Sequence, residues 1–240
     1  MRKRELIVAL DFPNPGVAQH LVQELHGLGV TYKIGLELFL AQGAGRKYVE
    51  DLVSQGNRVF LDLKFHDIPN TVAQAVAQAC AMGVDYFTVH LAGGPEMARS
   101  VLAQVAAFPG KRPLPLGVSV LTSFSETHWR STANAFSDSP RTVADSVFEL
   151  ASKASDWGLP GVICSPHELE RIKGSFRNLF CVVPGIRLEP GKDLQDQARV
   201  MTPVQAFSRG ADAIVVGRPI TQASHPRKVA EQILLEINPA

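Results

Sequence analysis

The chain has 240 residues, of which 45% are hydrophobic and 20% charged, with a formal net charge of +1. A chain of this length can bury a sizeable core, and no apolar run approaches the ~20 residues of a membrane span. The balanced charge gives no electrostatic reason to expect a nucleic acid or an acidic membrane surface as a partner. The three cysteines stand singly in apolar runs without CxxC spacing, which is typical of reduced, buried thiols.

The N-terminal stretch MRKRELIVALDF begins like a targeting segment, with basic residues before an apolar run. That run, residues 6–10, is shorter than the ~7–15 residues of a signal-peptide core, and it ends in Asp11 without a small-residue cleavage site. We therefore expect a first strand here, in a cytoplasmic protein.

Short apolar runs alternate with amphipathic segments along the whole chain. Near-continuous apolar runs are typical of strands buried on both faces of a parallel sheet. Strands are expected at 6–12, 31–35, 58–64, 86–91, 114–123, 161–166, 179–187 and 212–220. Segments between them, such as 17–28, 71–82 and 143–157, carry apolar residues at three- and four-residue spacing, which indicates helices.

The boundaries of these helices are also marked. A capping residue followed by proline, a pattern of helix starts, occurs at Asn14-Pro15, Ser165-Pro166 and Thr202-Pro203. Glycine follows the expected helix ends at Gly29, Gly56, Gly83, Gly158 and Gly210. Eight strand-like runs alternating with helices, without a linker, predict one (β/α)8 TIM barrel domain over residues 1–240. An open doubly wound α/β sheet is the alternative, but no GxGxxG follows the first strand.

Polar residues gather where the expected strands end, the place where such barrels carry their chemistry. These residues are Asp11, Lys33, Asp62, Lys64, His90, Thr122, Ser123, Arg187, Gly217 and Arg218. Any one of them could be a solvated strand end. Asp62 and Lys64 are a stronger signal, because residues two apart on a strand point to the same face and buried charges must be paired.

The end of the last expected strand, VVGRP at 215–219, suits the phosphate site that is common near strands seven and eight of these barrels. A turn glycine and a surface arginine would give the same pattern. The polar segment 187–203 could be an exposed loop or a lid. His66 and His90 lack metal-site spacing, so we expect hydrogen-bonding or structural roles. Trp129 is expected to pack on a loop.

Residues 62–71, DLKFHDIPNT, resemble the signature of the orotidine 5'-phosphate decarboxylase family. The resemblance continues at ALDF, YKIGLEL, VHLAGG, VLTS, VVPGIR and VVGRPI. It implies an enzyme without cofactor or metal that converts orotidine 5'-monophosphate into UMP and carbon dioxide, the last step of de novo pyrimidine nucleotide biosynthesis. Related hexulose-phosphate synthases share a DxKxxD core but use a divalent metal and tend to carry an acidic residue on the second strand, where this chain has Lys33.

The resemblance also implies a role for each matching residue. Lys64 would donate a proton to the pyrimidine carbon that loses carbon dioxide, and Asp62 would lie beside the substrate carboxylate. Asp67 and Thr71 would reach the site of a partner subunit, so that the working unit is a homodimer with shared sites. Asp11 and Lys33 would hold the ribose hydroxyls and complete the charged catalytic array. The other implied contacts are Thr122 to the pyrimidine, and Arg187, Gln197, Gly217 and Arg218 around the phosphate.

This chemistry accounts for the residue types. Loss of carbon dioxide leaves an electron pair in an sp² orbital that the ring cannot delocalise, so fixed positive charge must meet the anion. The Lys64 ammonium would supply that charge and then a proton, and Asp62 with a partner's Asp67 would keep it charged. Repulsion between Asp62 and the substrate carboxylate would add ground-state destabilisation, offset by binding energy at the phosphate.

Three other functions stay open on the sequence. They are a metal-dependent aldolase-type enzyme of the same barrel group, a Schiff-base aldolase using Lys64 or Lys33, and a catalytically inactive nucleotide-binding protein. Sensitivity to EDTA would identify the metal-dependent enzyme, and borohydride trapping with a carbonyl substrate would identify the Schiff-base aldolase. UMP binding without turnover would identify the inactive binding protein.

Overall fold

The computed structural model describes residues 4–133, 141–188 and 201–238. In these residues eight parallel strands close into a barrel in chain order, with β8 paired to β1. The strands are β1 (Glu5–Ala9), β2 (Thr31–Gly35), β3 (Arg58–Phe65), β4 (Tyr86–His90), β5 (Leu114–Val118), β6 (Gly161–Ile163), β7 (Phe180–Val183) and β8 (Ala213–Val216). The predicted (β/α)8 barrel is confirmed.

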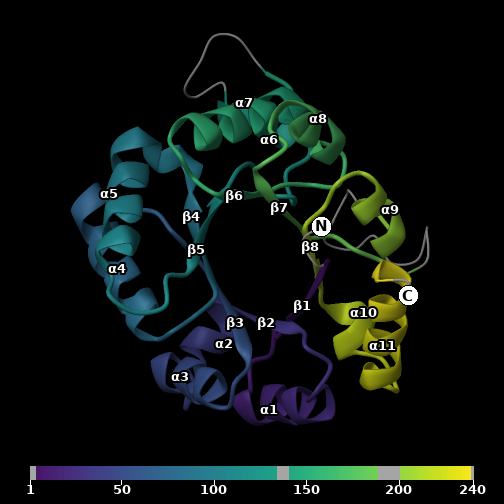
Figure 1. Ribbon diagram of the computed structural model, residues 1–240. Coiled ribbons are helices and arrows are strands. Elements are labelled where there is room, and N and C mark those ends of the chain that lie inside the picture. The colour runs from purple at the N-terminus through teal and green to yellow at the C-terminus, as the bar shows by residue number, and fades with distance from the viewer. Residues whose placement is uncertain (1–3, 134–140, 189–200, 239–240) are drawn as a thin grey trace.

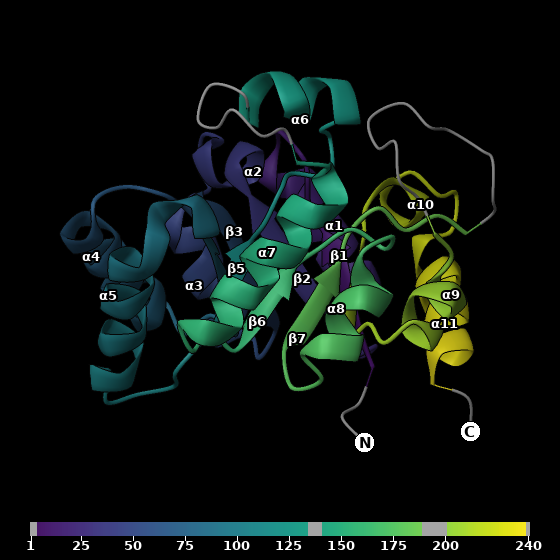
Figure 2. The same cartoon turned by 90° about the horizontal axis from the view of Figure 1, so that it is seen from above.

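Helices form an outer ring around the strands, as Figure 1 shows in a view along the barrel axis. They are α1 (Pro15–Glu24), α2 (Leu36–Leu40), α3 (Arg46–Ser54), α4 (Pro69–Ala81), the 3₁₀ turn η1 (Leu91–Gly93), α5 (Gly94–Ala107), α6 (Glu126–Ala133), α7 (Val143–Asp156), α8 (Leu169–Ser175), α9 (Pro203–Ser208), α10 (Arg218–Thr221) and α11 (Pro226–Ile237). In the side view of Figure 2, α2 and α6 lie toward the same end of the barrel, and Figure 1 shows them on opposite sides of its axis. α2 follows β2 directly and α6 is the first helix after β5, so this end is the one where the strands terminate.

Several strands are shorter than their apolar runs. The run expected at 114–123 leaves the sheet after Val118, and the run expected at 179–187 leaves it after Val183. The residues beyond these points still have apolar surroundings: Val120 and Leu121 line a cavity, and Ile186 forms an isolated bridge with Met201. The apolar runs in the sequence are therefore longer than the strands, because the rim of the barrel beyond the strand ends is itself partly buried.

Two apolar cores hold the barrel together. The larger one lies between the sheet and the helices, and the smaller one fills the interior of the barrel. Within the interior, the Tyr86 ring stacks on Phe180 (5.8 Å between centroids) and meets Phe60 edge-on (6.0 Å). Every second residue of each strand faces the barrel interior. Near the carboxyl ends of the strands, beyond the apolar core, the inward-facing residues can therefore be polar and line the mouth of the barrel.

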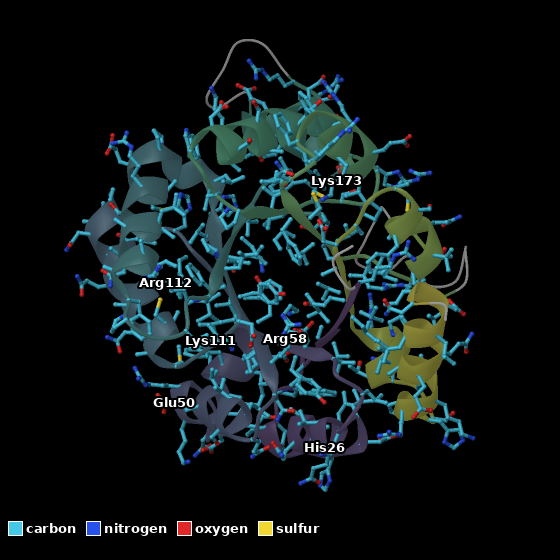
Figure 3. The ribbon with its side chains drawn as sticks, in the orientation of Figure 1. His26, Glu50, Arg58, Lys111, Arg112 and Lys173 are labelled. Carbon is cyan, nitrogen blue, oxygen red and sulfur yellow. The ribbon has the colours of Figure 1, made fainter. Side chains whose placement is uncertain are left out.

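The opposite, N-terminal end of the barrel is closed by charge pairs. Arg58, at the start of β3 and labelled in Figure 3, binds the carboxylates of Glu5 and Asp85 and donates to the Tyr86 hydroxyl. Polar residues at this end of such barrels contribute to stability rather than to chemistry.

Two of the three predicted caps are confirmed. Asn14 accepts a hydrogen bond from the Gly16 amide (2.7 Å), and Thr202 forms a capping box with Gln205 at the start of α9. The third prediction is wrong, because α8 begins at Leu169 and the Ser165 hydroxyl accepts from the His167 amide within the preceding turn.

Some smaller expectations are also decided. Trp129 packs as predicted, edge-on to Phe124, but it lies on helix α6 rather than on a loop, and its indole donates to the Ser146 hydroxyl (2.8 Å). The three cysteines are free and buried. Across the described ranges, no helix combines the length and the apolar character needed to cross a membrane.

Candidate active site

Four charged side chains form a chain of alternating sign at the carboxyl ends of the first three strands. Lys33 of β2 lies 2.8 Å from Asp11, which follows β1, and 3.7 Å from the Asp62 carboxylate on β3. Lys64 completes the chain, with its ammonium 2.9 Å from the other oxygen of Asp62. The ion pair that the sequence predicted between Asp62 and Lys64 is therefore present, and a second lysine braces it.

The inner members of this array are the most buried. The side chains of Lys33 and Asp62 are 11% and 14% exposed, whereas those of Lys64 and Asp11 are 36% and 56% exposed. A buried charge is tolerated when opposite charges and hydrogen bonds replace the lost water. Lys33 and Asp62 each have an opposite charge on two sides, and the outer members of the array, Lys64 and Asp11, are open to solvent.

The backbone at Lys64 is unusual. Its φ of +51° is the only positive value for a non-glycine residue in the described ranges, and the pairing of β3 with β4 shifts register between Leu61 and Phe65. A bulge of this kind re-aims side chains, and residues held in the left-handed region cluster at functional sites. The Lys64 amide donates to the Thr88 hydroxyl (2.8 Å), which donates in turn to Asp62 (3.0 Å).

Gly35, the last residue of β2, lies close against the charged array. A Cβ at this position would lie 3.1 Å from the Lys33 ammonium nitrogen and 3.2 Å from an Asp11 oxygen. A side chain would therefore press on the Lys33–Asp11 ion pair. Sequence reasoning overlooked both Gly35 and Thr88, although a glycine at a strand end and a threonine in the apolar run YFTVH were available signals.

A cavity of about 340 Å³ opens at the carboxyl ends of the strands, next to the array. Eight of the residues singled out in the sequence line it: Asp11, Lys33, Asp62, Lys64, Thr122, Arg187, Gly217 and Arg218. Its other walls are mainly apolar, from residues such as Val118, Ile163 and Val215. The cavity thus offers an anionic and cationic array, two further guanidinium groups and an apolar surface to one ligand.

Among the described residues, Asp67, Thr71, His90 and Ser123 were singled out in the sequence but are not part of this lining. Asp67 and Thr71 are exposed, at and just after the turn into α4, and the Asp67 carboxylate accepts from the Ile68 amide (2.6 Å). Gln197 lies outside the described residues, as does most of the segment 187–203 in which we considered a lid.

The two histidines near the array stack on each other. The rings of His66 and His90 have centroids 5.2 Å apart and planes 23° apart. Burial lowers the pKa of His90, and the neighbouring His66 and Lys64 charges lower it further. His90 also accepts a long hydrogen bond from the Ala92 amide through Nδ1, which requires that nitrogen to be unprotonated. A neutral His90 adds no charge to the array.

Within the part of the chain that is described, no three His, Cys, Asp or Glu residues are grouped so as to hold a metal ion.

A closed parallel barrel that collects its charged groups in a cavity at the carboxyl ends of the strands is the arrangement of a (β/α)8-barrel enzyme. The family model described as "Orotidine 5'-phosphate decarboxylase / HUMPS family" matches residues 4–233, and the chain belongs to this family.

Individual relatives are similar over almost their whole length. A protein named orotidine 5'-phosphate decarboxylase from Nitratidesulfovibrio vulgaris (strain DP4) is 44% identical over 237 residues, covering 97% of both chains. One of the same name from Legionella pneumophila (strain Corby) is 42% identical, covering 97% of this chain and 99% of its own. The crystal structure of orotidine 5'-phosphate decarboxylase from Lactobacillus acidophilus superposes with a TM-score of 0.86 at 36% identity, covering 98% of this chain and all of that one. The family resemblance expected from the sequence is confirmed.

Proposed function

We propose that this chain decarboxylates orotidine 5'-monophosphate to UMP without a cofactor, as the names of its relatives suggest. The observation that carries this proposal is the Lys64 ammonium, held 2.9 Å from Asp62 in a cavity that also contains Lys33 and Asp11. Such an array places fixed positive charge beside a reacting carbon and needs no reorganisation when an anion develops there.

In the proposed reaction the bond between pyrimidine carbon C6 and the carboxylate carbon breaks, and its electron pair remains on C6. Lys64 donates an ammonium proton to that carbon, which completes UMP, while carbon dioxide leaves. The lysine then regains a proton from solvent, to which its side chain is partly open. Asp62 would lie beside the substrate carboxylate and favour its departure by repulsion, at a cost offset by binding elsewhere.

The remaining lining residues suit the other parts of the nucleotide. Asp11 and Lys33 can hydrogen-bond ribose hydroxyls, and Thr122 with the apolar walls can contact the pyrimidine. Arg187 and Arg218 offer guanidinium groups for a phosphate, and Gly217 precedes Arg218 at the start of α10. We assign Gln197 to the same phosphate end on the family resemblance.

We further propose that the working form is a cytoplasmic homodimer with shared sites. Asp67, Ile68 and Thr71 are exposed around the start of α4, and Ile68 exposes 67% of its surface although it is a large apolar residue. An exposed isoleucine flanked by polar residues suits a contact with a second copy of the chain. In that arrangement Asp67 would supply the second carboxylate beside Lys64 of the partner subunit.

A single assay tests the reaction. Orotidine 5'-monophosphate is added to the purified chain in the presence of EDTA, and the ultraviolet absorbance and released carbon dioxide are followed. We expect full conversion to UMP with chelator present, because the array provides the charge that a metal would otherwise supply. Activity that requires a divalent metal would favour the aldolase-type rival, and tight UMP binding without turnover would favour an inactive binding protein.

Truncating Arg218 tests the phosphate assignment. Arg218→Ala is expected to weaken UMP binding by roughly 10- to 100-fold, because a charge-assisted contact to phosphate is lost. The affinity for uridine should change less than about threefold, because the nucleoside lacks that group. Both affinities can be measured by calorimetry. Arg99→Ala, which removes an exposed arginine paired with Glu96 on α5, is the matched control. Equal losses for uridine and UMP would refute the assignment.

A further inference from the structure

We propose that Thr88 is a positioning residue for the decarboxylation, which holds Lys64 and Asp62 in their working geometry from beneath the cavity. This inference rests on the proposed function and deepens it. Thr88 lies in the middle of β4, and its side chain is fully buried. It is not among the residues that line the cavity, so it would act through its neighbours rather than by touching the ligand.

The Thr88 hydroxyl joins the two residues by opposite hydrogen bonds. It accepts from the Lys64 backbone N–H at 2.8 Å and donates its single proton to Oδ1 of Asp62 at 3.0 Å. The same Asp62 oxygen accepts from the Lys64 ammonium at 2.9 Å. The contacts therefore close a ring that runs from the Lys64 amide through Thr88 and Asp62 to the Lys64 side chain. The backbone and the side chain of Lys64, the proposed proton donor, are therefore both held in place through Thr88.

The bulge in β3 explains why a side chain is needed here. Leu61 pairs with Phe87 and Phe65 with Val89, so β3 advances four residues where β4 advances two. The regular ladder is interrupted between these pairs, and the Lys64 amide bonds to a hydroxyl of β4 rather than to its backbone. Because Lys64 also has a positive φ, its conformation must be maintained by the surrounding contacts.

The mutation Thr88→Val removes the hydroxyl and keeps the shape of the side chain. We expect kcat for orotidine 5'-monophosphate to fall about 100-fold with KM changed less than about threefold, because a displaced Lys64 costs rate while the rest of the cavity still binds the nucleotide. Thr88→Ser should return kcat to within about fivefold of the wild type, because it restores both hydrogen bonds. If Thr88→Val does not fold, Thr88→Ala makes the same test with a smaller side chain.

The matched control is Thr31→Val, the same substitution on β2. Thr31 is also fully buried, and within the described residues its hydroxyl has no hydrogen-bond partner. This variant should keep kcat within about twofold of the wild type. A loss in Thr31→Val as large as that in Thr88→Val would show a general effect of the substitution in the barrel and would overturn the proposal.

A second measurement does not depend on catalysis. Amide hydrogen exchange at Lys64, followed by NMR, should be slow in the wild type, in Thr88→Ser and in Thr31→Val, and at least about tenfold faster in Thr88→Val. An unchanged kcat or an equally protected Lys64 amide in Thr88→Val would overturn the positioning role. A wild-type chain that releases no carbon dioxide would instead refute the proposed function, and the exchange data would still decide whether Thr88 holds Lys64.

Discussion

Lys64→Ala is expected to lower kcat/KM for orotidine 5'-monophosphate by at least roughly 10⁴-fold, because it removes both the charge that meets the carbanion and the proton that quenches it. The barrel should stay folded. Asp62 loses one partner in this variant but keeps the Lys33 ammonium 3.7 Å away and the Thr88 hydroxyl at 3.0 Å. Steady-state kinetics and denaturant unfolding measure the two effects separately.

Two controls make the Lys64 result interpretable. UMP binding to Lys64→Ala, measured by calorimetry, shows whether the cavity is intact. Lys47→Ala removes an exposed lysine paired with Asp51 on α3 and should leave activity unchanged, because surface ion pairs contribute little. Activity of Lys64→Ala within tenfold of the wild type would contradict the mechanism, whatever the fold of the variant.

Mixing two inactive variants should restore activity if the sites are shared. In a dimer of one Lys64→Ala chain and one Asp67→Ala chain, one site combines an intact Lys64 with an intact Asp67 of the other chain. When equal amounts of the two chains reassociate at random, half of the dimers are mixed. Each mixed dimer has one intact site out of two. The expected activity is therefore about one quarter of the wild type.

The mixing experiment needs chains that exchange partners, which subunit exchange of differently tagged variants establishes by affinity capture. The control mixes Lys64→Ala with Asp62→Ala. Because Asp62 and Lys64 of one chain contact each other, no mixed dimer would contain an intact pair. Rescue in this control, or none in the Lys64→Ala and Asp67→Ala mixture once exchange is shown, would argue against Asp67 acting across the interface.

The barrel could be predicted from the sequence because its signals are local. Apolar runs that lie in strands and amphipathic runs that lie in helices alternate regularly, and even the span 31–35 matches β2. The errors fall where burial continues without regular structure, as after Val118 and Val183. Ser165 was misread for a related reason, since its hydroxyl serves a turn before the helix and not the helix itself.

The candidate site was predicted in part. Asp62 and Lys64 were expected on one face from strand alternation, and they do meet, but through a bulge and a positive φ at Lys64 that alternation does not contain. Thr88 stands out in the sequence as a threonine in an apolar run, but its hydrogen-bond partners depend on the register between β3 and β4, which the sequence does not show. Asp67 illustrates a further limit, since within its own chain it contacts only the neighbouring Ile68 amide among the hydrogen bonds described.

The amino-acid sequence by itself determined the order of the elements and which residue types stand at the strand ends, because periodicity and local charge are properties of short stretches of chain. Only the tertiary structure decided that Asp11, Lys33, Asp62 and Lys64 form one array. The parallel pairing of β1 with β2 and of β2 with β3 brings three strand ends together, and the register shift in β3 aims the last of these side chains. Distances between residues far apart in the chain follow from packing, which no single segment specifies.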